Sequence, residues 1–516
     1  MQNMLVATPH PDKGSTSIRR VWVLFSAGVV LLTLVQLPIT LNFIFYAFED
    51  LGGSLKLSRL LAEGYRPTLD FYYPYGLLPL LFGRLWFGLL GSSPWAYLAA
   101  TLGCNLLLAW GLARFVVAMR AGAAAVVFLL VTLDFVARPM YLNLTHAFEA
   151  ALLVNALAEH ARGRRGVALA LLTICAFVKP SMAYIYGATL LALIVFDLAR
   201  DGSSLDRWRR TLGPAMVTGV GLAVLLAAYF GVEALLPVQF PIKGAASYRY
   251  VNYGFFAEGR NFWNPADASL NYYLGTPAGL WIVATLVLVA GGAVAARKGL
   301  RQDGDEGGRL VGEIALSTLV MHVAFVGLFY GAAWDWIAYF FVLAMGVIAV
   351  THRMRWGTPI LALFAAMSLL GHKSSIAGYY RAWTTTAPSA ITGGLWATPR
   401  QQAEWAHVLR LTQKSQPMLL STSGAAEAQF PQFVGTGSFY IHQALVEPLM
   451  PAPEKERISS RLRAAPTVVV VRNSPADVEA IPRFRQAMAG CHLAWRGTHF
   501  DVYRCDERRV GPGARA

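Results

Sequence analysis

Long apolar runs separated by short polar loops dominate the chain up to about residue 371. Most of the runs are roughly 17 to 25 residues long, the length of helix that crosses a bilayer core. The charged share of 14% is well below the roughly 25% of soluble domains. We therefore predict a polytopic α-helical membrane protein with about eleven transmembrane helices, at 21–46, 94–118, 122–138, 144–160, 166–178, 181–199, 214–235, 278–296, 311–330, 335–350 and 357–371.

The pattern changes after residue 371, where the apolar runs become too short to cross a membrane. Buried or alternating segments predict β-strands at 417–424, 467–473 and 499–505. Helical periodicity predicts helices at 399–413, 454–465 and 474–488. The sequence thus predicts two domains, a transmembrane domain at 1–371 and a small α/β domain at 372–516.

Lysine and arginine outnumber aspartate and glutamate by 44 to 29, which gives a formal net charge of +15. A basic chain often binds nucleic acid, but these cations lie in alternate short loops, which is a pattern of membrane topology. The cation-rich loops lie near 114–120, 161–166, 200–210, 297–309 and 353–355. The positive-inside rule makes these loops and the N-terminus cytoplasmic. We expect a multi-pass protein of a bacterial inner (cell) membrane with its C-terminal domain in the periplasm, and no nucleic-acid partner.

Three stretches on the predicted periplasmic side are too long to be turns, namely 47–93, 236–277 and 372–516. The apolar segment 76–91 carries Arg84 in its middle, and a span there would invert every later loop. We therefore predict an amphipathic helix at the membrane interface. The first apolar run is too long for the core of a signal peptide, so we expect it to remain as the first span.

The four cysteines divide between the two predicted domains. Cys104 and Cys175 fall in apolar runs, whereas Cys491 and Cys505 flank the last two strand-like segments. A hairpin would bring the second pair together, and a periplasmic location permits oxidation. This pattern favours a disulfide between Cys491 and Cys505.

Carboxylates and aromatic rings are concentrated in the first long loop. Glu49 and Asp50 directly follow the first apolar run, and Asp70 precedes Tyr72 and Tyr75. Acids at the end of a span can serve only to hold that end in water, and tyrosines are common at membrane interfaces. The combination also suits a sugar site, where rings stack on the apolar face of the sugar and carboxylates accept from hydroxyl groups.

These features resemble the GT-C glycosyltransferases that use polyprenyl-phosphate-linked sugars, including aminoarabinose transferase-like and protein mannosyltransferase-like proteins. The matching strings are "FED" at 48–50, "GYRPTLDFYYPYGLLP" at 64–79, "FGLLG" at 87–91 and "ICAFVKPS" at 174–181. The C-terminal soluble domain extends the likeness over nearly the whole chain. The sequence departs at Leu77-Leu78, where many relatives have Pro-Leu, and in the order Glu49-Asp50, where Asp-Glu is commoner. The second departure leaves open which acid is catalytic.

The resemblance implies that an acceptor hydroxyl attacks C1 of a sugar whose leaving group is polyprenyl phosphate. The hydroxyl needs a general base, for which Asp50 is the first candidate and Glu49 the second. Asp70 is a candidate to hold sugar or a metal. The leaving phosphate needs a nearby cation, and Lys179 lies at a predicted periplasmic turn where cations are otherwise scarce.

Further substrate-binding candidates lie in other predicted periplasmic segments. Arg138 and His146 flank the second periplasmic turn, and Glu149 follows His146 at helical spacing. Lys243 and Arg249 lie in an aromatic-rich loop that could cover the lipid phosphate or simply pack at the interface. A divalent metal held with Asp50 is possible, although no cofactor is certain.

We therefore expect a membrane glycosyltransferase that moves a sugar from a polyprenyl-phosphate donor to a lipid, glycan or protein acceptor on the periplasmic side. Two alternatives remain open. A multi-span transporter or lipid flippase would place charges at mid-membrane depth, and few charges fall there. A non-catalytic subunit of envelope polysaccharide assembly would use the α/β domain for docking.

Overall fold

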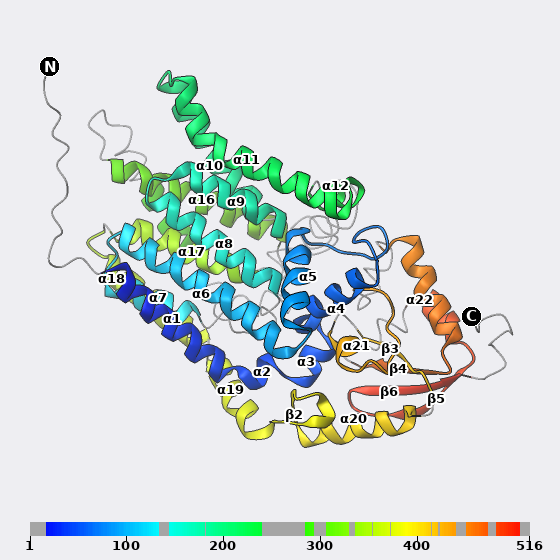
Figure 1. Cartoon of the computed structure of the whole chain (residues 1–516). Helices are drawn as coiled ribbons and strands as arrows, with labels where there is room; N and C mark the ends of the chain where they lie inside the picture. The colour runs from blue at the N-terminus through cyan, green and yellow to red at the C-terminus, as the bar shows by residue number, and fades with distance from the viewer. Residues whose placement is uncertain are drawn as a thin grey trace, which may run out of the picture.

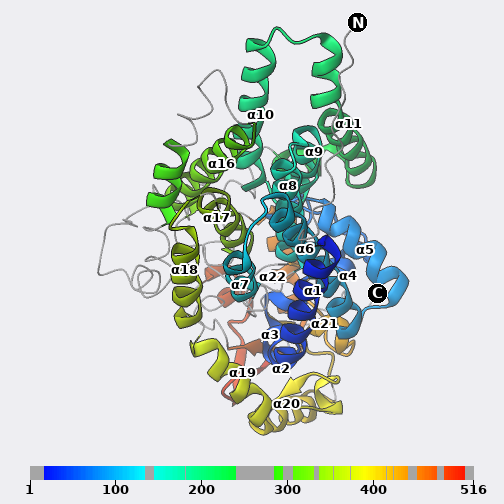
Figure 2. The same cartoon turned by 90° about the vertical axis from the view of Figure 1, so that its left-hand side faces the viewer.

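The computed structural model describes residues 17–133, 144–180, 182–239, 284–293, 306–329, 336–352, 354–371, 373–413, 415–421, 424–439, 450–472 and 481–505. These residues are mostly helical, and the long helices lie side by side in a bundle with the β-strands gathered at one end (Figure 1). At the opposite end, α10 (Met182–Arg200) and α11 (Leu205–Phe230) extend beyond their neighbours (Figure 2).

The bundle follows the predicted order of apolar runs. Its first helices are α1 (Ile18–Val35), α2 (Leu37–Thr40), α3 (Phe43–Phe48), α4 (Gly53–Ala62), α5 (Leu78–Leu90), α6 (Pro94–Ala118), α7 (Ala123–Thr132), α8 (Leu144–Ala161), α9 (Arg165–Val178) and, after α11, α12 (Val232–Gln239). Later helices are Ala284–Ala293, α16 (Glu306–Phe329), α17 (Trp336–Thr351), α18 (Gly357–Gly371) and α19 (Lys373–Thr385). Among the described helices, α1, α6, α10 and α11 are long and apolar enough to cross a membrane. The chain is therefore membrane-embedded, and the count of about eleven spans stays a prediction.

The first apolar run differs from the expected single helix at 21–46, because it is broken into α1, α2 and α3. Pro38 has no amide hydrogen to continue the helix, and α1 ends at Val35. Asn42 then caps α3 by accepting from the backbone N–H of Ile44 at 3.1 Å. At the first break, the buried Gln36 side chain donates to the Tyr379 hydroxyl at 2.8 Å, which ties the run to α19.

The expected span at 214–235 also differs from the structure. The helix starts earlier, at Leu205, and ends at Phe230. Gly231 has φ = 90°, a left-handed conformation that favours glycine and stops the helix. The chain then continues as the separate helix α12.

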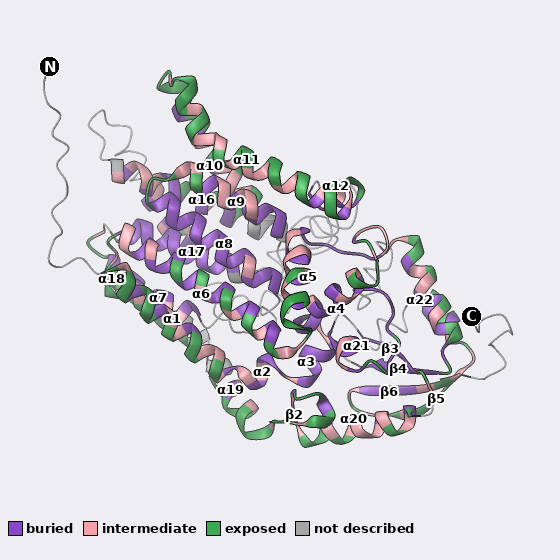
Figure 3. Ribbon diagram, viewed as in Figure 1, coloured by how far each residue is buried: buried purple, intermediate pink, exposed green. Residues whose placement is uncertain are grey.

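The helix α8 lies at the centre of the bundle, and nearly its whole surface is buried (Figure 3). It packs against α6, α9, α16 and α17. Gly111 of α6 lets α8 approach closely, since a Cβ there would lie 2.9 Å from a methyl carbon of Val154. At the same crossing, the Asn155 amide donates to the Leu107 carbonyl at 2.9 Å. This crossing fixes α8 against α6.

The C-terminal α/β part (387–505) contains the strands β1 (Ala387–Pro388), β2 (Trp396–Ala397), β3 (Met418–Leu420), β4 (Thr467–Val471), β5 (Cys491–Arg496) and β6 (Phe500–Cys505). Its helices are α20 (Pro399–Thr412), α21 (Ala426–Gln429), α22 (Ala452–Ala464) and α24 (Pro482–Ala487). Four strands form one sheet in the order β3-β4-β6-β5, in which β3 and β4 are parallel and the other pairs antiparallel. The strands expected at 417–424, 467–473 and 499–505 are thus present. Of the helix expected at 474–488, residues 482–487 are helical, and 474–480 lie outside the described residues.

The hairpin of β5 and β6 places Cys491 directly opposite Cys505, and the two form a disulfide. This confirms the pairing that their positions in the sequence favoured. Cys104 and Cys175 are free and buried in the bundle, as expected for apolar runs.

Candidate active site

The first long loop starts where the acids lie. Glu49 ends α3, and Asp50 opens a 3-10 turn, η1 (Asp50–Gly52), which leads into α4. The backbone here is packed tightly against the α/β part, because the Ala425 N–H donates to the Tyr46 carbonyl at 3.1 Å. A Cβ on Gly424 would lie 2.0 Å from the Ala47 carbonyl oxygen, so this approach requires glycine. The acid-bearing turn is therefore held between the bundle and the α/β part.

The far end of the same loop contacts the turn between α9 and α10. The Gly76 N–H donates to the Val178 carbonyl at 3.0 Å. A Cβ on Gly76 would lie 2.0 Å from the Phe177 carbonyl oxygen, so no side chain fits between the two segments. The string around Gly76 and the string ending at Lys179, which both contributed to the family resemblance, are thus in direct contact.

Lys179 forms the centre of a buried polar group with His146 and Glu149. The Lys179 ammonium lies 3.1 Å from Glu149 Oε2 and 3.3 Å from His146 Nδ1, and the three residues are 1%, 3% and 1% exposed. An ammonium can only donate, so Nδ1 of His146 accepts. The Tyr75 ring meets the His146 ring edge to face, with centroids 5.8 Å apart. Four residues from three sequence segments converge here.

This arrangement keeps a positive charge at the end of α9 and holds it in a fixed position. Charges that are buried need a partner, and Glu149 supplies it at ion-pair distance. In the part of the chain that the structure describes, no group of three or more His, Cys, Asp or Glu side chains could hold a metal ion.

The other tyrosine and acid of the loop lie elsewhere. Tyr72 is 2% exposed and packs in the core of the α/β part with Met418, Leu420 and Ile458. The Asp70 carboxylate accepts from the Arg66 side chain at 3.1 Å and from its backbone N–H at 2.8 Å. Burial raises the pKa of Asp70, but these hydrogen bonds offset that effect and the pKa lies below its usual value. Of Asp70, Tyr72 and Tyr75, the structure therefore brings Tyr75 to His146, next to Lys179.

Three further candidates, Arg138, Lys243 and Arg249, lie outside the described residues, and their roles stay predictions. In the sequence, Glu149 stands out only for its helical spacing from His146, and the structure makes it the ion-pair partner of Lys179. The signal was the spacing of His146 and Glu149 by three residues, which places both on one face of α8.

A second set of contacts, which the sequence did not predict, joins the loop to α22 and α21. The Glu454 carboxylate accepts from the Tyr72 N–H at 2.7 Å and from the Ser438 hydroxyl. On the next turn of α22, Arg457 donates to the Asp70 carbonyl. Nearer the start of the loop, the Lys56 ammonium lies 3.3 Å from Glu427 Oε1, and both residues are buried. The α/β part therefore fixes the path of the loop.

The Glu454 contact predicts a pH-dependent stability. Burial raises the pKa of Glu454 to about 7, against an ordinary value of 4.5. The folded protein then binds the proton more tightly than the unfolded chain, so the contribution of Glu454 to stability is full below about pH 4.5 and is lost as pH rises to about 7. The slope is at most about 1.4 kcal/mol per pH unit. We expect Glu454→Gln to flatten this slope in thermal melts of the full chain. Glu456→Gln, on the exposed face of the same helix, should leave it unchanged.

Comparison with known proteins places this geometry in a known fold. No protein-family model matches the sequence, and no curated protein matches it. Among solved structures, the chain is similar to ArnT from Cupriavidus metallidurans bound to undecaprenyl phosphate, with 14% identity and a TM-score of 0.50 over 95% of this chain and 99% of that chain. The apo state of the same protein gives 19% identity and a TM-score of 0.43 over 96% and 100%. The first likeness confirms the expected GT-C-like fold.

Proposed function

We propose that this chain, which has the fold of ArnT, is a glycosyltransferase that moves a sugar from a polyprenyl-phosphate donor to a lipid, glycan or protein acceptor. The observation that carries the proposal is the buried ammonium of Lys179, held by Glu149 and His146 at the turn that contacts Gly76, in the same long loop that bears Glu49 and Asp50. The solved ArnT structure of the same fold contains undecaprenyl phosphate, which supports a lipid phosphate as the ligand of this chain.

In the proposed reaction, the acceptor hydroxyl attacks C1 of the sugar, and the bond between C1 and the phosphate oxygen breaks. The hydroxyl proton passes to a carboxylate, for which Asp50 is the first candidate and Glu49 the second. The electron pair of the broken bond stays on the phosphate, so negative charge develops there. Lys179 meets that charge, and it needs no reorganisation because Glu149 already fixes its position.

Tyr75 and His146 complete the proposed site on the side of the first loop. Their edge-to-face contact orients both rings at the start of α8. A tyrosine ring that contacts His146, which in turn contacts Lys179, suits a ligand with a sugar face next to a phosphate. Asp70 and Tyr72 act in this proposal by shaping the loop, since their polar groups bind Arg66, Arg457 and Glu454.

We place the reaction on the periplasmic side of a bacterial inner membrane. The distribution of cations among the loops supports this side, and the disulfide between Cys491 and Cys505 suits an oxidising compartment. A sugar nucleotide is not at hand there, so a lipid-linked donor meets the need for an activated sugar. The domain division at 371/372 is part of the same proposal, with 372–516 as the periplasmic domain.

The test is a transfer assay with the full chain in proteoliposomes that contain polyprenyl-phosphate-linked sugars and candidate acceptors. We expect sugar to appear on the acceptor in step with release of free polyprenyl phosphate. Movement of the lipid-linked sugar between leaflets without release of the phosphate would contradict transfer and identify a flippase. Binding of glycan without either activity would favour the non-catalytic subunit.

A further inference from the structure

A cavity of about 920 Å³ lies at the end of the bundle away from the α/β part. It is lined by the end of α8, the start of α9, the end of α10, the first turns of α11 and the start of α16. Since α9 runs from Arg165 at this cavity to Lys179 at the candidate active site, the two sites are separated by the full length of that helix. Nothing in the proposed transfer reaction uses this end of the bundle.

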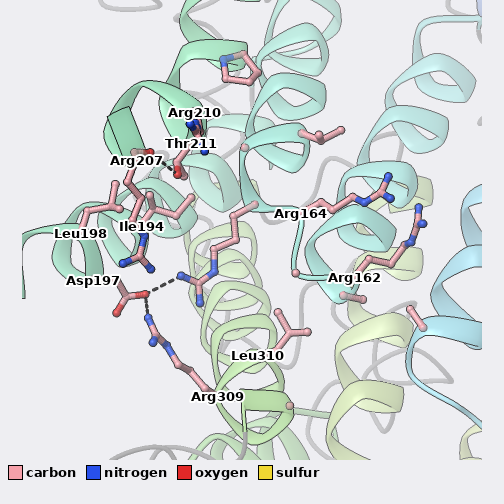
Figure 4. A pocket seen from close by; sticks show the side chains of 18 residues that line it. Arg162, Arg164, Ile194, Asp197, Leu198, Arg207, Arg210, Thr211, Arg309 and Leu310 are labelled. Carbon is pink, nitrogen blue, oxygen red and sulfur yellow. Dashed lines mark hydrogen bonds and ion pairs between the residues drawn. The ribbon is translucent and has the colours of Figure 1, made fainter. Parts of the chain in front are cut away.

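Arginines dominate the polar lining of the cavity. Asp197 is the one carboxylate among the described residues that line it, against the six arginines Arg162, Arg164, Arg165, Arg207, Arg210 and Arg309. Figure 4 shows Arg207 and Arg210 on one helix and Arg162 and Arg164 on the chain across from it. The cavity therefore favours a ligand that carries negative charge.

Ion pairs with carboxylates hold several of these arginines in place. Arg165 lies 2.7 Å from the Asp197 carboxylate and also pairs with Glu313. Arg309 pairs with the same two acids, and its Nε is 3.2 Å from Glu313 Oε1. These ion pairs neutralise part of the positive charge of the arginines, but they also hold the guanidinium groups in fixed positions before a ligand binds. A preorganised site loses less entropy on binding than a flexible one.

Arg162 pairs with Glu159 at 3.2 Å and Arg207 with Asp201 at 3.5 Å, so the least neutralised charge lies on Arg210 of α11 and on Arg164 before α9. Arg210 pairs with no carboxylate among the described residues, and Arg164 reaches only Glu159, at 3.8 Å. The helices α9 and α11 approach closely, since a Cβ on Gly166 of α9 would lie 2.6 Å from the Thr211 carbonyl oxygen of α11. This approach brings the guanidinium groups of both segments to one cavity, where planar forks suit phosphate oxygens.

The apolar part of the lining distinguishes a lipid from a free ion. Val167, Ile194, Leu198 and Leu310 line the same space as the arginines. The cavity also lies at the ends of apolar helices, the depth at which phospholipid headgroups meet a membrane protein. Basic pockets between transmembrane helices are typical sites for anionic headgroups. We propose that this cavity binds the phosphate headgroup of an anionic phospholipid, with the start of its acyl chains on the aliphatic side chains.

The experiment compares lipids on the purified full chain in detergent. We expect phosphatidylglycerol to raise the thermal midpoint and to stay bound in native mass spectrometry, whereas phosphatidylcholine does neither. Arg164→Gln combined with Arg210→Gln should weaken phosphatidylglycerol binding by about thirtyfold, roughly fivefold for each arginine. Both side chains are exposed, so the double variant should fold. Arg209→Gln, on the same helix but outside the lining, should bind as the parent does.

Each other result overturns the proposal. An equal effect of inorganic phosphate at matched concentration would make the cavity an ion site rather than a lipid site. Equal binding by the double variant and by Arg209→Gln would mean that the arginines set membrane orientation only. Sugar transfer is measured in parallel on the same variants. Failure of the proposed transfer function at the Lys179 end is thereby distinguished from failure of lipid binding at this cavity.

Discussion

Replacing Lys179 with methionine should reduce sugar transfer by about a hundredfold to a thousandfold, the cost of removing one preorganised charge from a developing oxyanion. The same change leaves Glu149 buried at 1% exposure without its ion-pair partner. Removing one member of a buried pair costs about 3 to 5 kcal/mol. We therefore expect both a lower thermal midpoint and lower transfer, measured on the purified variant in proteoliposomes.

A double variant separates the two effects. Lys179→Met combined with Glu149→Gln removes both charges, so most of the lost stability should return while transfer stays low. Free undecaprenyl phosphate gives an independent measurement, because it should raise the thermal midpoint of the parent but not that of the double variant. If the double variant regains both stability and transfer, Lys179 is a structural cation and the proposed phosphate contact is wrong. Lys179→Arg keeps the charge and should retain part of the activity.

The sequence predicted the helices best where local signals and burial agree. The bounds of α6 at 94–118 match the expected span, because Ser93 caps the helix by accepting from the Ala96 N–H at 3.1 Å and Pro94 suits the first turn. The break at Pro38 was also visible in the sequence. It was missed because the apolar run continues to Ala47 and hydropathy alone does not register a kink.

The candidate site could be predicted from the sequence less completely than the helices could. A cation at a predicted periplasmic turn is unusual and makes Lys179 a candidate in the sequence, and the structure places it in a buried ion pair. Its partner Glu149 lies thirty residues earlier, on a different helix, and only the packing of α8 on α9 brings them together. The bond from the Tyr72 N–H to Glu454 spans 382 positions. No local sequence pattern predicts such a contact, because it depends on how the α/β part packs against the first loop.

The docking of the α/β part also bears on which acid acts as the base. Glu49 is half-buried at the end of α3, where its backbone is extended. Asp50 begins η1, the first turn on the loop side of that helix. Close packing of Gly424 and Ala425 against the preceding chain fixes where this turn lies. A general base must lie within hydrogen-bond distance of the acceptor hydroxyl. Because the turn is held in place, we expect only one of the two adjacent carboxylates, Glu49 or Asp50, to reach that hydroxyl.

We expect Asp50→Asn to lower the transfer rate by about a hundredfold to ten-thousandfold, the usual contribution of a positioned general base. Glu49→Gln is the matched control, since it removes an equal charge from the adjacent position and should cost much less. Binding of free undecaprenyl phosphate should survive in both variants, because Lys179 and its partners are unchanged. The loss should therefore appear in kcat rather than in KM for the donor. A larger loss in Glu49→Gln than in Asp50→Asn would reverse the assignment, and full activity in both would remove the loop acids from the chemistry.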